Sequence, residues 1–179
     1  RVIYRGQELT GQNQSKIEAL RGREIGYIGN NPGSALDPTI AVGHQIVEKL
    51  RAVEPGISKK EAKDRTIAML KAVRLPRPEE RFHEFPFQYS GGMMQRALIV
   101  DALVTNPAFV IADNVTQPLD VTIAAQIIRL MHELREEFNT AIIFVSSSLA
   151  VVREIADDII VLNDGVIVER NSSDKIVNA

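Results

Sequence analysis

Two periodicities of hydrophobic and polar residues divide this chain into strands and helices. In the first part, short apolar runs typical of strands occupy residues 1–4 and 24–28,. Residues 39–104 then follow a helical spacing, in which residues 40–53 and 58–73 each place their apolar side chains on one face,. The pattern therefore predicts a mainly helical region between strands.

Local signals set the limits of the second of these helices. Ser58 has the side chain of an N-cap, and Glu61, three residues later, completes the sequence pattern of a capping box,. Pro76 and Pro78 are expected to end the helix and to begin a turn-rich linker, because proline lacks the amide hydrogen that a helix needs,.

After Pro107 the pattern changes to strands that alternate with helices. The predicted elements are a buried strand, a long helix, a second strand, a short helix and a hairpin, at residues 109–112, 120–138, 141–145, 149–155, and 159–162 with 166–169. The long helix has one apolar face, which consists of Ile123, Ile127, Leu130, Met131, Leu134 and Phe138,. The Asp164-Gly165 step favours a tight hairpin turn,. The sequence thus predicts one α/β domain over residues 1–179, with a helical subdomain at residues 39–104.

Composition narrows the functional classes. The 179 residues, of which 45% are hydrophobic and 25% charged, suit one domain with a sizeable core,. The net charge of −2 gives no electrostatic reason to expect nucleic acid as a partner,. Cysteine is absent, which excludes disulfides and thiolate metal sites, and no apolar run approaches the roughly 20 residues of a bilayer span,. If a membrane is involved, we expect another chain to cross it.

Two motifs carry candidate chemistry. Ser90, Gly91 and Gly92 begin a predicted helix, and Asp113 ends the buried strand that follows it. Free amide groups at the start of a helix favour an anion, and an acid at the end of a strand can hold Mg²⁺. Each motif also has a simpler interpretation, as a helix cap followed by two turn glycines and as an acid leaving a strand at the surface. Together they point to a nucleotide.

Six further landmarks occur with these motifs in a fixed order, namely Arg21-Gly22, Asn31-Pro32, Leu36-Asp37-Pro38, Val42-Gly43-His44-Gln45, Leu119-Asp120-Val121-Thr122 and Ala156-Asp157. In this set the chain resembles an ATP-binding-cassette (ABC) ATPase over nearly its whole length, most closely the subunits of peptide and nickel importers. The resemblance implies a P-loop NTPase-like core, ATP and Mg²⁺ as ligands, a second ABC ATPase subunit as partner, and transmembrane permease subunits. It also implies a location at the cytoplasmic face of the cell membrane.

The resemblance assigns roles to the two motifs. In that family two cassettes face each other head to tail, and the signature motif of one binds the γ-phosphate of the ATP held by the other. The matching residues here are Ser90, Gly91, Gly92, Met93 and Gln95. Asp113 matches the aspartate that binds Mg²⁺, usually through water. Asp120 matches the D-loop, which crosses the dimer interface, and an N-cap of the following helix is an equally good role for it.

Three positions that the family uses for hydrolysis carry other residues. Asn114 stands at the catalytic glutamate, Ser147 at the switch histidine and Asn30 at the Q-loop glutamine. A neutral amide cannot accept a proton at physiological pH, and general-base help is worth roughly 10² to 10⁴ in rate. The side chains of Ser147 and Asn30 are shorter than those they replace, and a misplacement of about 1 Å can cost on the order of 10²-fold. We therefore predict that this chain's own site is impaired in hydrolysis.

The phosphate-binding loop Gly-x-x-x-x-Gly-Lys-Ser/Thr does not occur in these residues,. In the family it lies a few tens of residues before the position at which this sequence begins, so we interpret the sequence as a fragment or as a chain without the loop. Two functions remain open. One is an importer subunit that lends its signature to a partner cassette, and the other is a non-catalytic regulatory or scaffold module that no longer binds nucleotide. The altered positions can stem from natural decay or from engineering.

Two other groups of residues are weaker candidates. The histidines lack metal-ligand spacing and are interpreted as ordinary surface or packed residues, namely His44, His83 and His132,. Four aromatic residues lie just before the signature, and they fit either packing under the helical subdomain or a contact surface for a membrane subunit: Phe82, Phe85, Phe87 and Tyr89,.

Overall fold

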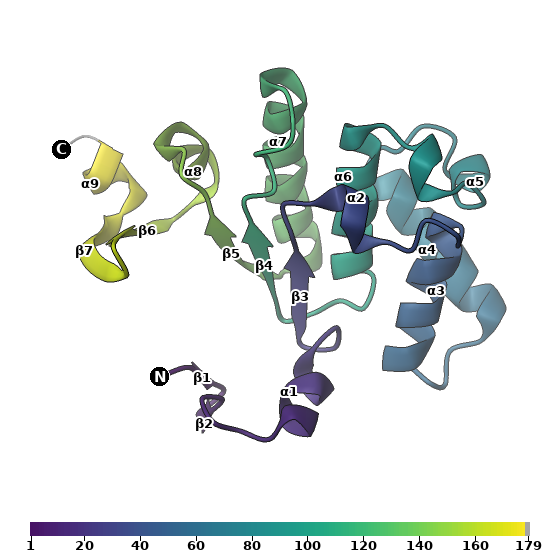
Figure 1. Cartoon of the computed structure of the whole chain (residues 1–179), viewed down its shortest axis with the longest axis horizontal. Helices are drawn as coiled ribbons and strands as arrows, with labels where there is room; N and C mark the ends of the chain where they lie inside the picture. Colours follow the sequence, from purple (N-terminus) through teal and green to yellow (C-terminus); the bar gives the residue numbers. More distant parts are fainter. Residues whose placement is uncertain (178–179) are drawn as a thin grey trace.

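A three-stranded parallel sheet lies at the centre of the computed structural model, which describes residues 1–177 (Figure 1). Its strands are β3 (Ile25–Ile28), β4 (Phe109–Asp113) and β5 (Ala141–Val145), in that order. The register pairs Ile28 with Ala112 and Ala112 with Phe144. All three carboxyl ends therefore meet at one edge of the sheet. The three strands predicted from the apolar runs are confirmed.

Two long helices cover one face of this sheet, α6 (Gly91–Leu103) and α7 (Val121–Phe138). The predicted apolar face of α7 is confirmed, because four of its residues are buried and Ile123 and Phe138 pack at the margin of the core. On the opposite face Tyr27, Ile143 and Val145 are exposed over 58%, 54% and 43% of their surface. The α/β prediction thus holds, with one well-covered face of the sheet.

The helical region between β3 and α6 consists of α2 (Pro32–Ala35), α3 (Val42–Val53), α4 (Lys59–Ala72), α5 (Pro78–Arg81) and the 3₁₀ helix η1 (Pro86–Gln88). Helices α3 and α4 pack against each other and against α6. Ser58 caps α4 as predicted, since its Oγ accepts a hydrogen bond of 3.1 Å from the backbone N–H of Glu61. Lys49 on α3 forms an ion pair of 2.6 Å with Asp101 on α6. That residues 39–104 form a subdomain of their own stays a prediction.

Gly43, near the start of α3, lies against the ring of Phe82. A Cβ added to Gly43 would come within 2.2 Å of that ring. The ring is 1% exposed, and it is surrounded by the rings of His44 and His83 at 5.3 and 4.9 Å and by Lys63 at 5.2 Å. Only glycine therefore allows α3 to approach the segment that leads to the signature.

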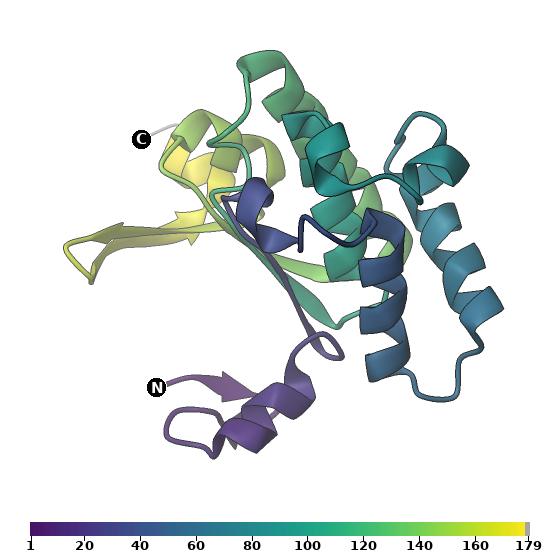
Figure 2. The same cartoon turned by 45° about the vertical axis from the view of Figure 1, so that its right-hand side comes forward.

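The ends of the chain form smaller units (Figure 2). At the start, β1 (Ile3–Tyr4) pairs with β2 (Gln7–Glu8), and α1 (Gln14–Leu20) follows. At the other end come α8 (Leu149–Ile155), β6 (Asp158–Asn163), β7 (Val166–Ser172) and α9 (Ser173–Val177). Strands β6 and β7 pair antiparallel around Asp164 and Gly165, which confirms the predicted hairpin. Within residues 1–177 we find no helix with the length and apolar character of a bilayer span.

Candidate functional site

The residues predicted for catalysis lie together at the carboxyl edge of the sheet. Asn30 follows β3, Asn114 follows β4 and Ser147 follows β5, while Asp113 is the last residue of β4. Because Ile28, Ala112 and Phe144 are in register, the chain leaves all three strands at the same level. The carboxyl edge is where open α/β sheets bind ligands. The structure thus places these residues where a ligand site is expected.

The carboxylate of Asp113 is engaged by two neighbours. The Asn114 side-chain amide donates to Asp113 Oδ1 at 3.0 Å, and the Tyr27 hydroxyl donates to Oδ2 over a longer distance of 3.5 Å. Asn114 also donates its backbone N–H to the carbonyl of Val145 at 2.9 Å. Tyr27 was missed by the sequence analysis, because in a short apolar strand its residue type gives no sign that its hydroxyl reaches the next strand.

Asn114 has a left-handed backbone, with φ of 51°. Asparagine tolerates this conformation better than most residues, because its short polar side chain can form local hydrogen bonds. In Asn114 that hydrogen bond is the one to Asp113. The conformation and the side chain at this position therefore match each other.

Replacement of Asn114 by glutamate, which the resembling family carries at this position, should destabilise the fold. We expect Asn114→Glu to lower the free energy of unfolding by about 1–2 kcal/mol, because glutamate is strained in a left-handed conformation and brings a second carboxylate beside Asp113. The same substitution should leave the chain without measurable ATP hydrolysis. Urea denaturation measures the change in the free energy of unfolding. The matched control is Asn139→Glu, at a second left-handed asparagine with φ of 47°. A variant at Asn114 that is as stable as the starting protein would contradict the prediction.

The signature residues begin α6. Ser90 is its N-cap, and its Oγ accepts a hydrogen bond of 3.3 Å from the backbone N–H of Met93. Ser90 and Gly91 are exposed, whereas Gly92 and Met93 are half-buried. A Cβ on Gly92 would lie 2.9 Å from Cγ2 of Ile123 on α7, so glycine is needed for the close approach of the two helices. In Figure 1 the N-termini of α6 and α7 lie on the same side of the molecule as the carboxyl ends of the strands.

Asp120 caps α7, since its Oδ1 accepts a hydrogen bond of 2.9 Å from the backbone N–H of Ile123. This confirms the capping interpretation, and the D-loop role stays a prediction. The segment before Asp120 is a bonded turn, in which Gln117 N–H donates to the Asn114 carbonyl and Leu119 N–H to that of Thr116, both at 3.1 Å. Leu119 in turn lies 3.9 Å from the position of a Cβ on Gly91. This turn joins the strand-edge residues to the signature.

The position of Gln95 corrects one prediction, namely that its side chain contacts the ATP of the partner. Its side chain is 0% exposed, so in this conformation it cannot contact a nucleotide held by another chain. Both polar atoms of its side-chain amide, Oε1 and Nε2, lack a hydrogen-bond partner among the described residues. The sequence carried a signal for this burial, because most residues of α6 near Gln95 are apolar, and Met94, Ala97, Leu98 and Ile99 are buried with it,.

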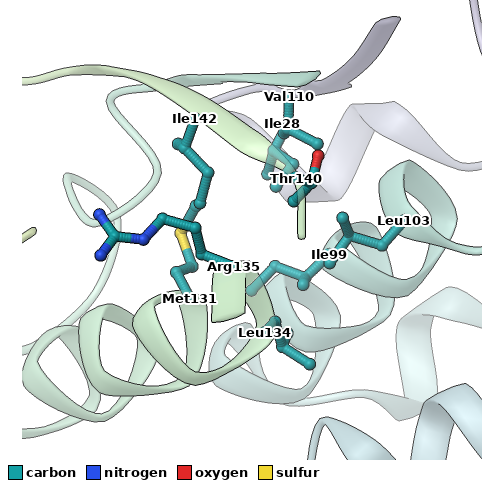
Figure 3. Close-up of a pocket in the computed structure, with 9 residues that line it drawn as sticks. All are labelled: Ile28, Ile99, Leu103, Val110, Met131, Leu134, Arg135, Thr140 and Ile142. Atoms are coloured by element: carbon teal, nitrogen blue, oxygen red, sulfur yellow. The ribbon is translucent and has the colours of Figure 1, made fainter. Parts of the chain in front are cut away.

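A small hollow in the described part is not a nucleotide site. It lies between the sheet and helices α6 and α7 and has a volume of only about 10 Å³. Figure 3 shows the residues that line it, which are Ile28, Ile99, Leu103, Val110, Met131, Leu134, Arg135, Thr140 and Ile142. The guanidinium of Arg135 points away from it and donates to Asp157 at 3.1 Å. The hollow is therefore a small gap in the apolar core.

The histidines and aromatic residues that were weaker candidates differ in their surroundings. Among residues 1–177, no three or more histidine, aspartate or glutamate side chains gather in a way that could hold a metal ion. Of the aromatic residues before the signature, Phe82 and Tyr89 are buried, which confirms a packing role for these two. Phe85 and Phe87 are exposed and stack on each other with centroids 5.7 Å apart. A contact of this pair with a membrane subunit stays a prediction.

Comparisons with known proteins agree with this fold and with these landmarks. A family model described as ABC transporter matches residues 1–117, which is more than half of the chain. The chain therefore belongs to the ABC transporter family, as its motifs indicate.

Particular relatives show which branch of the family it resembles. The chain is 43% identical over 175 residues to the oligopeptide transport ATP-binding protein OppD of Bacillus subtilis (strain 168), and the match covers 98% of this chain and 49% of that protein. It is 38% identical over 175 residues to the dipeptide transport ATP-binding protein DppD of Lactococcus lactis subsp. cremoris (strain MG1363), with 98% and 50% covered. The chain thus spans about half the length of the curated relatives it matches.

A solved structure confirms the predicted ABC ATPase fold. The ATP-binding cassette MJ0796, in a dimeric post-hydrolysis state bound to ADP and Pi, superimposes with a TM-score of 0.82 at 26% sequence identity. The match covers 95% of this chain and 72% of that one. A second dimeric structure of the same cassette gives a TM-score of 0.80, also at 26% identity, with 92% and 69% covered.

Proposed function

We propose that this chain is the nucleotide-binding part of an ABC importer for peptides or nickel complexes, impaired in its own site, which lends its signature to the ATP of a second cassette. The observation that carries the proposal is the contrast between two groups of residues. Ser90 and Gly91 are exposed at the start of α6. At the strand edge, by contrast, Asn30, Asn114 and Ser147 offer no general base,. The dimeric state of the similar cassette MJ0796 supports the pairing.

The start of α6 suits a terminal phosphate. The first N–H groups of a helix have no acceptor within the helix, and among the described residues Ser90 Oγ accepts that of Met93 alone,. This leaves the amides of Gly91 and Gly92 for phosphate oxygens. Ser90 also keeps its hydroxyl hydrogen for donation, and the helix dipole favours negative charge at this end. The signature residues can therefore bind the γ-phosphate of an ATP that the partner holds with Mg²⁺.

The proposed dimer has one active and one inactive site. In a head-to-tail dimer each composite site takes its signature from one chain and its catalytic residues from the other. Replacement of the three strand-edge residues consequently affects one site only. Transmembrane permease subunits would hold the pair at the cytoplasmic face of the membrane, and Asp120 would lie at the interface between the cassettes.

The test uses a partner whose own signature serine is replaced by alanine, so that hydrolysis depends on the signature of this chain. A suitable partner is the OppD protein of Bacillus subtilis, a relative of the same type. We expect the chain alone to hydrolyse ATP at least about 10²-fold more slowly than an unmodified partner, and the mixture to regain hydrolysis. Turnover by the isolated chain at the rate of an ordinary cassette would refute the impaired site. A mixture that does not regain ATP hydrolysis would favour the scaffold function instead.

A further inference from the structure

The only acidic side chain of β4 accepts hydrogen bonds at both of its carboxylate oxygens. The two donors come from different places. Asn114 is the next residue along the chain, and Tyr27 lies on the neighbouring strand β3. The register pairs Tyr27 with Ile111, which places Tyr27 and Asp113 on the same face of the sheet, because side chains two residues apart along a strand point the same way,. The contact is therefore a consequence of how the strands pair.

The amide of Asn114 is held in this position. Its left-handed backbone turns the side chain back toward Asp113, and its backbone N–H is fixed by the Val145 carbonyl at 2.9 Å. Tyr27 is held less tightly, because it is 58% exposed and its contact with Asp113 is longer. Its ring lies beside the end of β3, 3.2 Å from the position of a Cβ on Gly29. The two donors thus differ in strength but converge on one carboxylate.

These neighbours do not fit a magnesium ion. Mg²⁺ takes oxygen ligands in a near-ideal octahedron, usually from one or two carboxylates together with waters and phosphates. The groups that face Asp113 are an amide N–H and a phenol O–H, which occupy one acceptor site on each carboxylate oxygen and so compete with a cation or its waters,. Among the described residues, Asp113 has no cluster of further acidic or histidine side chains to compensate.

We propose that Asn114 and Tyr27 together keep the Asp113 carboxylate from binding a divalent metal ion. Tyr27 is then a positioning residue of the chain's own site, which loses its metal as well as its general base. The inference rests on the proposed function only in that it concerns the same impaired site. The proposed role of Tyr27 differs from ordinary packing, because packing depends on the ring of Tyr27 whereas the proposal depends on its hydroxyl.

The test uses Mn²⁺, which favours oxygen ligands as Mg²⁺ does and broadens nearby NMR signals. The full chain is labelled with ¹⁵N and titrated with Mn²⁺ in the absence of nucleotide, and the amide signals of Asp113 and Asn114 are followed. The variant Tyr27→Phe/Asn114→Ala removes both donors and keeps the ring. Asp113→Asn provides the baseline without a carboxylate, and the amide signals of α7 report whether each variant is folded.

We expect the starting protein to broaden no more than Asp113→Asn. The double variant, which loses both competing hydrogen bonds, should broaden at a Mn²⁺ concentration at least about threefold lower, since the loss of even one such bond predicts a shift of that size. Tyr27→Phe alone should shift the titration in the same direction, which keeps the test decisive if Asn114→Ala does not fold. Equal broadening of the starting protein and the double variant would overturn the proposal. Because no ATP or partner is present, this outcome would leave the lending of the signature untouched.

Discussion

Replacement of Ser90 by alanine should lower ATP hydrolysis by a mixed dimer of this chain and a competent cassette by about 100-fold. The loss of one positioned donor to the charge that develops in a transition state typically costs on the order of 10² to 10³ in rate. Ser90 is exposed at the N-terminus of α6, where its hydroxyl hydrogen is free for a phosphate. The measurement is steady-state phosphate release at saturating ATP, with the partner's own signature serine replaced by alanine.

Ser58→Ala is the matched control for this variant. Ser58 caps α4 in the way that Ser90 caps α6, with a hydrogen bond of 3.1 Å to the N–H three residues on, compared with 3.3 Å for Ser90. Both substitutions should therefore lower the free energy of unfolding by a similar amount, about 1 kcal/mol. Only Ser90→Ala should affect hydrolysis. If both variants hydrolyse ATP at the same rate, Ser90 acts as a helix cap alone and the proposed function is wrong.

Replacement of Gly43 by alanine should lower the free energy of unfolding by about 2–3 kcal/mol. The new methyl group would meet three carbons of the Phe82 ring at 2.2, 2.4 and 2.6 Å, and each distance is far below van der Waals contact. The ring is buried and has neighbours on several sides, so it cannot move aside without a change in packing. Overpacking of this kind costs about 1–3 kcal/mol and occasionally more.

Urea denaturation measures this effect, and Gly56→Ala is its control. Apart from its neighbours along the chain, no atom of residues 1–177 lies within 4 Å of a Cβ added to Gly56, so we expect its substitution to change stability by less than about 0.5 kcal/mol,. Addition of Phe82→Leu to Gly43→Ala should recover part of the loss, because the smaller side chain leaves room for the methyl group. Equal unfolding free energies for Gly43→Ala and Gly56→Ala would show that the ring can give way.

The longer elements of this fold could be predicted because their side chains repeat. Helix α7 has a buried face with a clear helical period, and β3, β4 and β5 are short apolar runs between turn signals. The elements that were missed are the two-residue strand β2 and the short helices α1, α2, α5, η1 and α9. Neither α1 nor α2 contains a buried residue. Without a buried face, such segments show no periodicity from which a helix could be predicted.

The candidate site was predictable where a residue acts through its own chain neighbours. Ser90 and Asp120 were expected as helix caps from their residue types and positions, and both caps are present. Gln95 was assigned to the partner's ATP together with the rest of the signature motif, although most residues around it on α6 are apolar. Tyr27 could not be found, since its contact with Asp113 depends on which strands pair and in which register. Such information arises only when distant parts of the chain fold together.

The bonded turn between Asn114 and Leu119 has a mechanical consequence. Two backbone hydrogen bonds hold this turn and restrict how far its two ends can shift independently. Its far end, Leu119, lies 3.9 Å from the position of a Cβ on Gly91. In the proposed dimer, this turn would therefore be the stretch of backbone that connects the two composite sites to which this chain contributes.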